Sequence, residues 1–222
     1  MARSEVLMDD RSRTAPGARG FTLIELLIVI AILGLLAAVL VPNILGSKEI
    51  ANITATEATM MQLETGCAGF NRENGYFPPD DLKWPEKEKT GTWKPDNGQN
   101  TGIESLVTFL SQSKKGGMDL GTLADHLTNT DADDSGVELP LLHRRDRPEV
   151  ADAWGTPLAY FCRSGLERTQ TVVPADGQES QPGVKARRRA DGTYYGAGKF
   201  QLLSAGPDRI FGTDDDLFWP KN

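Results

Sequence analysis

The sequence predicts an α+β protein in which a long N-terminal helix, half transmembrane and half amphipathic, packs on a small C-terminal antiparallel β-sheet with loop insertions. Three observations predict this class. An apolar run lies near the N-terminus, an apolar stripe at helical spacing follows it, and short strand candidates separated by turn residues lie towards the C-terminus. The length of 222 residues accommodates one domain of ordinary size and an additional segment.

The apolar run FTLIELLIVIAILGLLAAVLVP covers residues 21–42, and Glu25 is its single charged residue. A helix of about 22 residues, at about 1.5 Å per residue, is long enough to span the core of a bilayer. The run exceeds a usual signal-peptide core and has no small-residue cleavage site at its end, so we expect it to stay in the protein. The preceding residues 1–20 form a polar leader that we expect to be disordered. Its arginines, Arg19 among them, place the N-terminus in the cytoplasm by the positive-inside rule.

An amphipathic helical pattern continues through residues 43–75, where Asn74 and Gly75 provide a stop signal. We therefore expect one helix from about Phe21 to about Asn74, interrupted near Pro42. The apolar stripe recurs at intervals of three and four and consists of Ile53, Thr56, Met60, Leu63, Cys67 and Phe70.

Residues 76–222 form the predicted globular region. Residues 80–101 are rich in charged and turn-forming side chains and are interpreted as a surface loop. Gly102–Ser113 has the pattern of a short amphipathic helix, whereas residues 114–150 are mixed and hard to place. The strand candidates are Pro157–Cys162, Thr171–Val173, Gly192–Tyr195 and Lys199–Ser204.

The composition excludes several classes of function. The net charge of −7 argues against a nucleic-acid partner, which requires a basic face. His126 and His143 have no Cys or His near them at ligand spacing, so no structural zinc site is expected. No nucleophile elbow, zinc-protease motif or P-loop occurs, and we expect neither enzymatic activity nor catalytic residues. Cys67 and Cys162 can form a disulfide in an exported compartment, but two separate buried thiols are the interpretation we favour.

The motif that carries the function is Arg-Gly-Phe-Thr-Leu-Ile-Glu at residues 19–25, and it resembles the cleavage and methylation motif of type IV prepilins. The resemblance implies that a prepilin peptidase cuts between Gly20 and Phe21 and that Phe21 becomes the N-methylated terminus. It also implies that the helix loosens around Gly34 and Pro42, the two weak helix formers of the run, when the subunits assemble.

A role for Glu25 also follows from physical chemistry, without the family resemblance. A carboxylate within a membrane-spanning helix is costly unless it finds a partner, and the apolar run contains no basic residue. Cleavage after Gly20 creates an amine on Phe21, four positions away. In a staggered bundle the amine of one subunit can approach Glu25 of the next subunit, which neutralises both charges and fixes the axial register.

Further segments resemble, in the same order, the major pseudopilin of type II secretion systems. The resemblance implies a single-pass inner-membrane protein with a periplasmic globular region. It also implies a helical homopolymer with minor pseudopilins and an inner-membrane assembly platform as partners. A surface pilus for adhesion, motility or DNA uptake is the alternative, and a membrane-anchored periplasmic enzyme or a calcium-dependent adhesin is less favoured. The segments are residues 41–49, 74–78, 102–110, 152–157 and 200–216, whereas residues 80–101 and 114–148 look like insertions.

A calcium site is expected in the C-terminal loop. Asp208, Asp215 and Asp216 can converge there, with the carbonyls of Ala205 and Thr213 as further ligands and Asp214 as an alternative carboxylate. The resembling pseudopilins bind calcium with acids at matching positions. A second acidic stretch, residues 131–136, opens like an EF-hand loop, but its twelfth position is Leu142 and not Glu. We interpret that stretch as a solvated loop.

Overall fold

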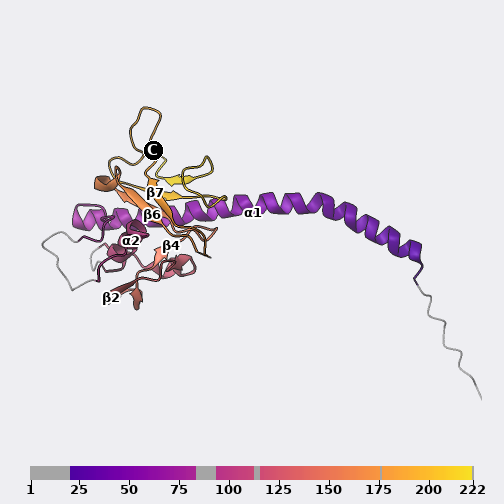
Figure 1. Ribbon diagram of the computed structural model, residues 1–222, viewed down its shortest axis with the longest axis horizontal. Coiled ribbons are helices and arrows are strands. Elements are labelled where there is room, and N and C mark those ends of the chain that lie inside the picture. The colour runs from indigo at the N-terminus through magenta and orange to yellow at the C-terminus, as the bar shows by residue number, and fades with distance from the viewer. Residues whose placement is uncertain (1–20, 84–93, 113–115, 176, 222) are drawn as a thin grey trace, which may run out of the picture. The chain divides into compact units, whose positions relative to one another are not determined.

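The computed structural model describes residues 21–83, 94–112, 116–175 and 177–221. The chain divides into two compact units, Met1–Gly46 and Ser47–Asn222. An apolar helix lies in the N-terminal part, and small antiparallel sheets form the C-terminal part, so the predicted α+β class is confirmed (Figure 1).

Helix α1 extends from Leu23 to Asn74, within two residues of the predicted bounds. It ends because Gly75 takes a left-handed conformation, with φ at 80°, and donates its amide to the Asn71 carbonyl at 2.7 Å. The helix is continuous past Pro42, so the predicted interruption there is wrong for this chain on its own. Proline removes one backbone hydrogen bond, and the apolar helix retains the bonds on both sides.

The C-terminal part of α1 buries the predicted stripe. Thr56, Met60, Leu63, Cys67 and Phe70 are all buried, and Ile53 at the start of the stripe is half-buried. The i, i+3 and i, i+4 spacing places them on one face of the helix, which packs against the rest of the second unit.

Helix α2, Thr101–Gln112, confirms the helix predicted at Gly102–Ser113. Two 3₁₀ helices, η2 at Leu120–His126 and η3 at Arg163–Gly165, lie in the connections. Nine short strands form four antiparallel sheets among the described residues. They pair β1 (Leu127–Thr128) with β4 (Glu149–Val150), β2 (Asp134–Leu139) with β3 (Arg144–Asp146), and β6 (Thr169–Val172) with β7 (Gln181–Lys185); the fourth sheet has the order β5 (Ala159–Cys162), β8 (Phe200–Ser204), β9 (Leu217–Trp219).

The three-stranded sheet separates two apolar clusters. Tyr160 of β5 lies opposite Leu202 of β8, and both contribute to the cluster formed with α1 and α2. Ala159 and Leu203 alternate with them and face the second cluster, which Val172 and other residues of the β6–β7 sheet cover. Because both faces of β5 are covered, the whole strand is buried.

Three of the four predicted strands are confirmed by β5, β6 and β8. The fourth prediction, Gly192–Tyr195, is wrong: this segment forms one isolated bridge between Tyr194 and Arg188. Gly192 and Gly196 both have positive φ angles, so the chain turns at each end of the segment before a ladder can extend.

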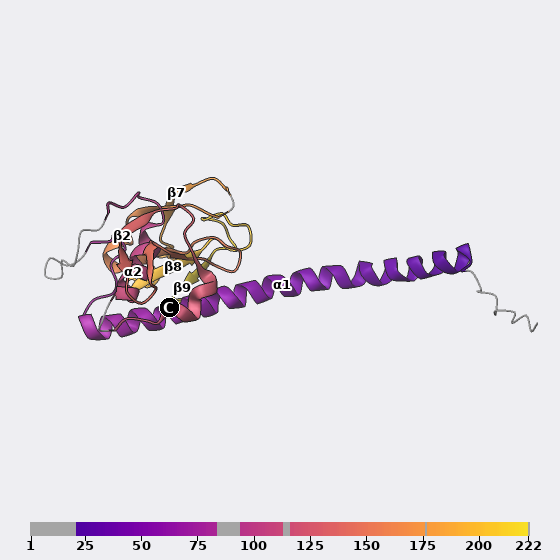
Figure 2. The same cartoon turned by 90° about the horizontal axis from the view of Figure 1, so that it is seen from below.

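The second unit holds its part of α1 through polar contacts as well as apolar ones. The Trp219 indole donates to Glu64 at 2.6 Å, Lys221 pairs with Glu57, and the Ala153 amide donates to the Thr56 hydroxyl at 3.1 Å. The end of the chain, including β9, therefore lies along the C-terminal half of α1 (Figure 2).

Candidate assembly motif and metal sites

The N-terminal motif forms a reciprocal cap on α1. Thr22 precedes the first helical residue, and its hydroxyl accepts from the Glu25 amide at 3.2 Å. The Thr22 amide in turn donates to Glu25 Oε2 at 2.9 Å, and the Thr22 hydroxyl donates to the same oxygen at 2.7 Å. This Thr-x-x-Glu capping box holds the Glu25 carboxylate at the positive end of the helix. Phe21 lies next to it and is exposed, whereas Gly20 is outside the described residues.

The apolar stretch that follows meets the requirements of a membrane anchor. The segment Leu23–Leu40 is long and apolar enough to cross a membrane, with a mean hydropathy of 3.0. Its large apolar side chains are exposed in the single chain, and a Cβ added at Gly34 would contact nothing within 4 Å. An exposed apolar surface of this size requires lipid or other subunits to cover it.

The predicted calcium loop folds back on itself. Asp215 accepts the Asp208 amide at 3.1 Å and the Thr213 hydroxyl at 2.5 Å. Asp216 accepts the Gly212 amide at 2.9 Å through Oδ2, while its Oδ1 is buried with no hydrogen-bond partner among the described residues. The structure therefore brings Thr213 and Asp215 together with the Asp208 backbone, but the Asp208 carboxylate accepts instead from the Ile210 amide at 2.8 Å.

The chemistry of this loop fits a hard cation. Burial raises the pKa of Asp216, whereas the hydroxyl of Thr213 lowers the pKa of Asp215. A buried carboxylate oxygen without a donor is a costly feature that an ion would relieve. Ala205 at the start of the loop is fully buried. These residues can hold calcium through oxygen ligands, and the site remains a prediction.

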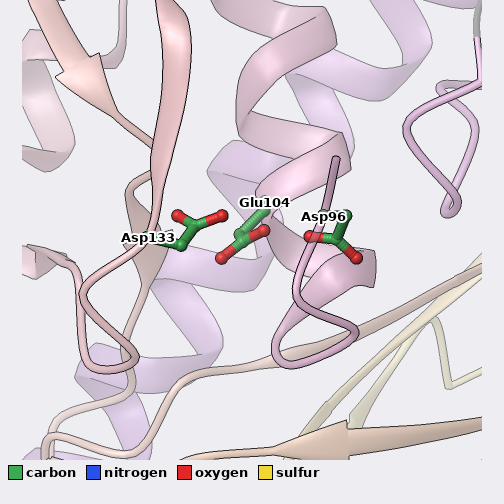
Figure 3. Close-up of side chains that lie close together, drawn as sticks. All are labelled: Asp96, Glu104 and Asp133. Atoms are coloured by element: carbon green, nitrogen blue, oxygen red, sulfur yellow. The ribbon is translucent and has the colours of Figure 1, made fainter. Parts of the chain in front are cut away.

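A second group of carboxylates gathers where α2 begins. One oxygen from each of Asp96, Glu104 and Asp133 lies within 4.8 Å of the other two. Figure 3 shows Glu104, on α2, between Asp96 and Asp133, which come from flanking loops. Glu104 belongs as well to a second such group with Asp131 and Glu149. The interpretation of residues 131–136 as a solvated loop is therefore wrong for Asp133, whose side chain is 9% exposed.

Arg147 provides the main counter-charge of this acidic cluster. Its side chain is 2% exposed, and Nη1 lies 2.5 Å from Asp133 Oδ2 and 3.5 Å from Asp96 Oδ1. Nη2 donates to the Lys94 carbonyl. Burial is the main cause that raises the pKa of Asp133, and it also raises that of Glu149 to about 7. The guanidinium thus pairs with two of the five carboxyl groups that the two overlapping groups contain.

The comparisons with known proteins agree with the N-terminal motif. Residues 16–41 match the prokaryotic N-terminal methylation motif. The chain is also 26% identical over 205 residues to the type II secretion system core protein G of Escherichia coli K12, a match that covers 92% of both chains. The chain is a type IV pilin-like protein.

Other relatives of the pilin-like protein share shorter stretches. It is 40% identical over 60 residues to core protein G of Klebsiella pneumoniae, covering 27% of this chain and 43% of the relative. It is 63% identical over 41 residues to the type IV wide pilus major component of Thermus thermophilus, covering 18% of this chain and 31% of the relative. No solved structure matches the chain.

The two cysteines of the pilin-like protein are free and buried, as the favoured interpretation expected. The Cys162 thiol lies 3.1 Å from Asp80 Oδ1, and the Cys162 amide donates to Oδ2 of the same carboxylate at 3.3 Å. Burial raises the pKa of Cys67 far above its ordinary value. Both thiols are therefore poor nucleophiles that pack as small core residues.

The acidic cluster and the Thr22 cap were not predicted from the sequence. A signal for the cap was present in the Thr-x-x-Glu spacing at residues 22–25. No local signal could reveal the acidic cluster, because Asp96, Glu104 and Asp133 are far apart in the chain. The interpretation of residues 80–101 as a surface loop is wrong for its last part, because Asp96 belongs to the acidic cluster and Asn100 is 1% exposed.

Proposed function

We propose that the mature chain is a structural subunit of a pseudopilus, a periplasmic fibre that polymerises through its N-terminal helix and drives type II protein secretion. The observation that carries this proposal is the 26% identity to core protein G, because it covers 92% of both chains and so includes the globular region as well as the helix. The relatives carry the names of structural components, and we expect no enzymatic activity from this subunit.

Processing comes first in this proposal. A prepilin peptidase removes residues 1–20 by cutting after Gly20, and Phe21 is then N-methylated. The apolar part of α1 anchors the precursor in the inner membrane with its N-terminus in the cytoplasm, and the globular region lies in the periplasm. The single chain then joins a homopolymer with minor pseudopilins on an inner-membrane assembly platform.

Glu25 is the residue that we propose to set the register of the fibre. In the single chain its carboxylate is held at the helix terminus by Thr22. Cleavage places the new amine of Phe21 at that same end of the helix. Since the capping box already orients the carboxylate, a neighbouring amine can pair with Glu25 without a change in the helix. Gly34 and Pro42 remain the predicted positions where the helix loosens during assembly.

Calcium is proposed as a structural cofactor of the C-terminal loop, with Asp208, Asp215, Asp216, Ala205 and Thr213 as ligands. Calcium would neutralise the acidic loop and stabilise the connection between β8 and β9. In the full-length protein, calcium should raise the melting temperature by mass action, more than magnesium does. An Asp215→Ala variant should lose this gain; an identical melting temperature of the wild-type protein in calcium and in chelator would exclude the proposed site.

A surface pilus is the second candidate, and the similarity to the wide pilus component of Thermus thermophilus favours it. That similarity covers 18% of this chain, against 92% for the secretion protein. The secretion role is therefore the better supported of the two.

The experiment that separates these functions is deletion of the gene followed by complementation. Deletion should block release of the type II substrates into the medium, and the wild-type gene should restore it. Glu25→Val should enter the membrane and be processed, because the substitution removes a charge from the apolar run, but it should not restore secretion. Glu49→Val, at an exposed position of α1 outside the run, is the matched control. Normal secretion in a deletion strain that has lost surface fibres would favour the pilus.

A further inference from the structure

The acidic cluster at the start of α2 contains one fully buried carboxylate, that of Glu104, which has no donor within the described part of the chain. Glu104 is 0% exposed, and neither Oε1 nor Oε2 has a hydrogen-bond partner among the described residues. Buried carboxylates are otherwise paired, bonded to several donors or bound to a metal ion. The side chain lies between Asp96 and Asp133 (Figure 3), so its oxygens face other acids.

The carboxylates beside Glu104 already accept hydrogen bonds from other groups. Asp96 Oδ2 accepts the Gly98 amide at 3.1 Å and the Thr101 hydroxyl at 2.6 Å, and Glu149 accepts from Asn100 at 2.8 Å. Asp133 Oδ2 is paired with Arg147, but Asp133 Oδ1 is buried and has no partner in the described part of the chain. Three oxygens, two from Glu104 and one from Asp133, therefore remain as acceptors at one place.

The available positive charge does not balance these acids. Arg147 pairs with Asp133 and Asp96, and Lys94, the nearest lysine in sequence to Asp96, pairs with Asp134 outside the cluster at 2.6 Å. The two overlapping groups contain five acidic side chains; Asp96 and Asp133 are paired with Arg147, and the other three have no ion pair among the described residues. The arrangement thus combines an excess of negative charge with unused oxygen ligands, which is the chemistry that hard divalent cations require.

We propose that Glu104, Asp133 and Asp96 bind a divalent cation of the calcium class, with Glu104 as a bidentate ligand. This site is separate from the C-terminal loop, and it is built from residues 94–100 and 127–150, which include parts of the two segments that look like insertions. The cation connects these segments to α2. The twelfth position of the 131–142 stretch, where an EF-hand loop has a bidentate glutamate, is Leu142. In this site, Glu104 of α2 takes the place of that glutamate.

The competing state is a protonated Glu104. Burial, followed by the charges of Asp133, Asp131, Asp96 and Glu149, raises the pKa of Glu104 to about 11 when no metal is present. A neutral glutamic acid could donate one hydrogen bond to a neighbouring carboxylate but would leave the remaining acids unbalanced. Replacing Glu104 by glutamine imitates this neutral form, so the two states make opposite predictions for that variant.

The test measures bound calcium by equilibrium dialysis with radioactive Ca²⁺ on the full-length chain in detergent, after treatment with chelator. Glu104→Gln should bind one calcium ion fewer per chain than the wild-type protein. Glu138→Gln is the matched control, because Glu138 lies in the adjacent strand β2 with its side chain 59% exposed, and it should bind as the wild type does. Asp215→Ala should lose a different ion, so the double variant with Glu104→Gln should lose both.

Melting temperatures provide a second readout. In chelator, Glu104→Gln should melt close to the wild-type protein, because glutamine imitates the protonated Glu104 of the metal-free state; in calcium the wild-type protein should melt higher. Asp133→Asn tests the same ion if Glu104→Gln fails to fold. Equal calcium stoichiometry in the wild-type protein and in a folded variant of either position would overturn the site, as would identical melting of Glu104→Gln and the wild type in both conditions. These measurements need no fibre, so they are independent of the proposed role in secretion.

Discussion

The C-terminal loop offers a matched pair of glycines whose replacement separates backbone strain from close packing. Gly206 and Gly212 both have positive φ angles, of 67° and 94°. A Cβ at Gly206 would lie 2.3 Å from the Asp215 carbonyl oxygen, whereas a Cβ at Gly212 would meet nothing within 4 Å. Alanine at either position costs about 1–2 kcal/mol for the left-handed conformation. At Gly206 it must also displace the Asp215 backbone.

The additional loss of stability in Gly206→Ala comes from the hydrogen bonds that Asp215 accepts. Its carboxylate accepts hydrogen bonds from Asp208 and Thr213, each worth about 0.5–1.5 kcal/mol. Gly206→Ala should therefore be less stable than Gly212→Ala by about 1–3 kcal/mol, which corresponds to roughly 2–12 °C in melting temperature. Thermal unfolding of both variants, followed by circular dichroism of the full-length chain in detergent and chelator, measures this difference. Equal melting temperatures would show that the loop does not close on Asp215.

Three other outcomes follow from the same structure. Gly20→Val should keep the leader attached, because a side chain at this position obstructs an extended approach to the peptidase, and an intact mass showing efficient cleavage would contradict the assigned junction. Alkylation under non-reducing, denaturing conditions should add two labels, one each at Cys67 and Cys162, whereas an unchanged mass would reveal a disulfide. Burial raises the pKa of Asp152. The wild-type protein should therefore lose stability relative to Asp152→Asn as the pH rises above about 4, which urea titrations at several pH values measure. A stability difference between the two proteins that does not change with pH would argue against this pKa shift.

The sign of the Asp152 effect follows from which state holds the proton. A carboxyl group whose pKa is higher in the folded state binds more protons there than in the unfolded state, so raising the pH disfavours folding. Asp152 nevertheless accepts the Trp154 and Thr156 amides and the Ser204 hydroxyl, at 3.0, 2.9 and 2.6 Å. Asparagine retains an acceptor for the amides, whereas alanine would remove the acceptor of all three donors, at about 1–3 kcal/mol for each donor left buried and unpaired.

The helices could be predicted from the sequence because their signals are local. The spacing of Met60, Leu63 and Cys67 indicates one buried face, and the Asn74-Gly75 pair indicates where the helix ends. Strands β5 and β8 were predictable for a related reason: both are short segments rich in apolar residues and bounded by turn residues.

The remaining elements depend on partners that are distant in the sequence. Strand β9 follows three consecutive aspartates and has three residues, so its extended conformation comes from its pairing with β8. The acidic cluster likewise requires α2 and two loops to meet. Arg147 stands among charged residues that are typical of a solvated segment, yet it is one of the largest fully buried side chains among the described residues. Long-range packing determines both results, and the periodicity of a short window contains no information about it.

The contacts of the chain end have a mechanical consequence. Ser47–Asn74 of α1 is held by Trp219 and Lys221, which come from the opposite end of the same unit. A force applied along this helix is therefore transmitted to β9 as well as to the buried apolar face, and β9 is joined to the central strand β8 through their ladder. The first and last segments of the unit are thus tied to each other directly, so a pull on the helix is resisted by β9 as well as by the apolar core.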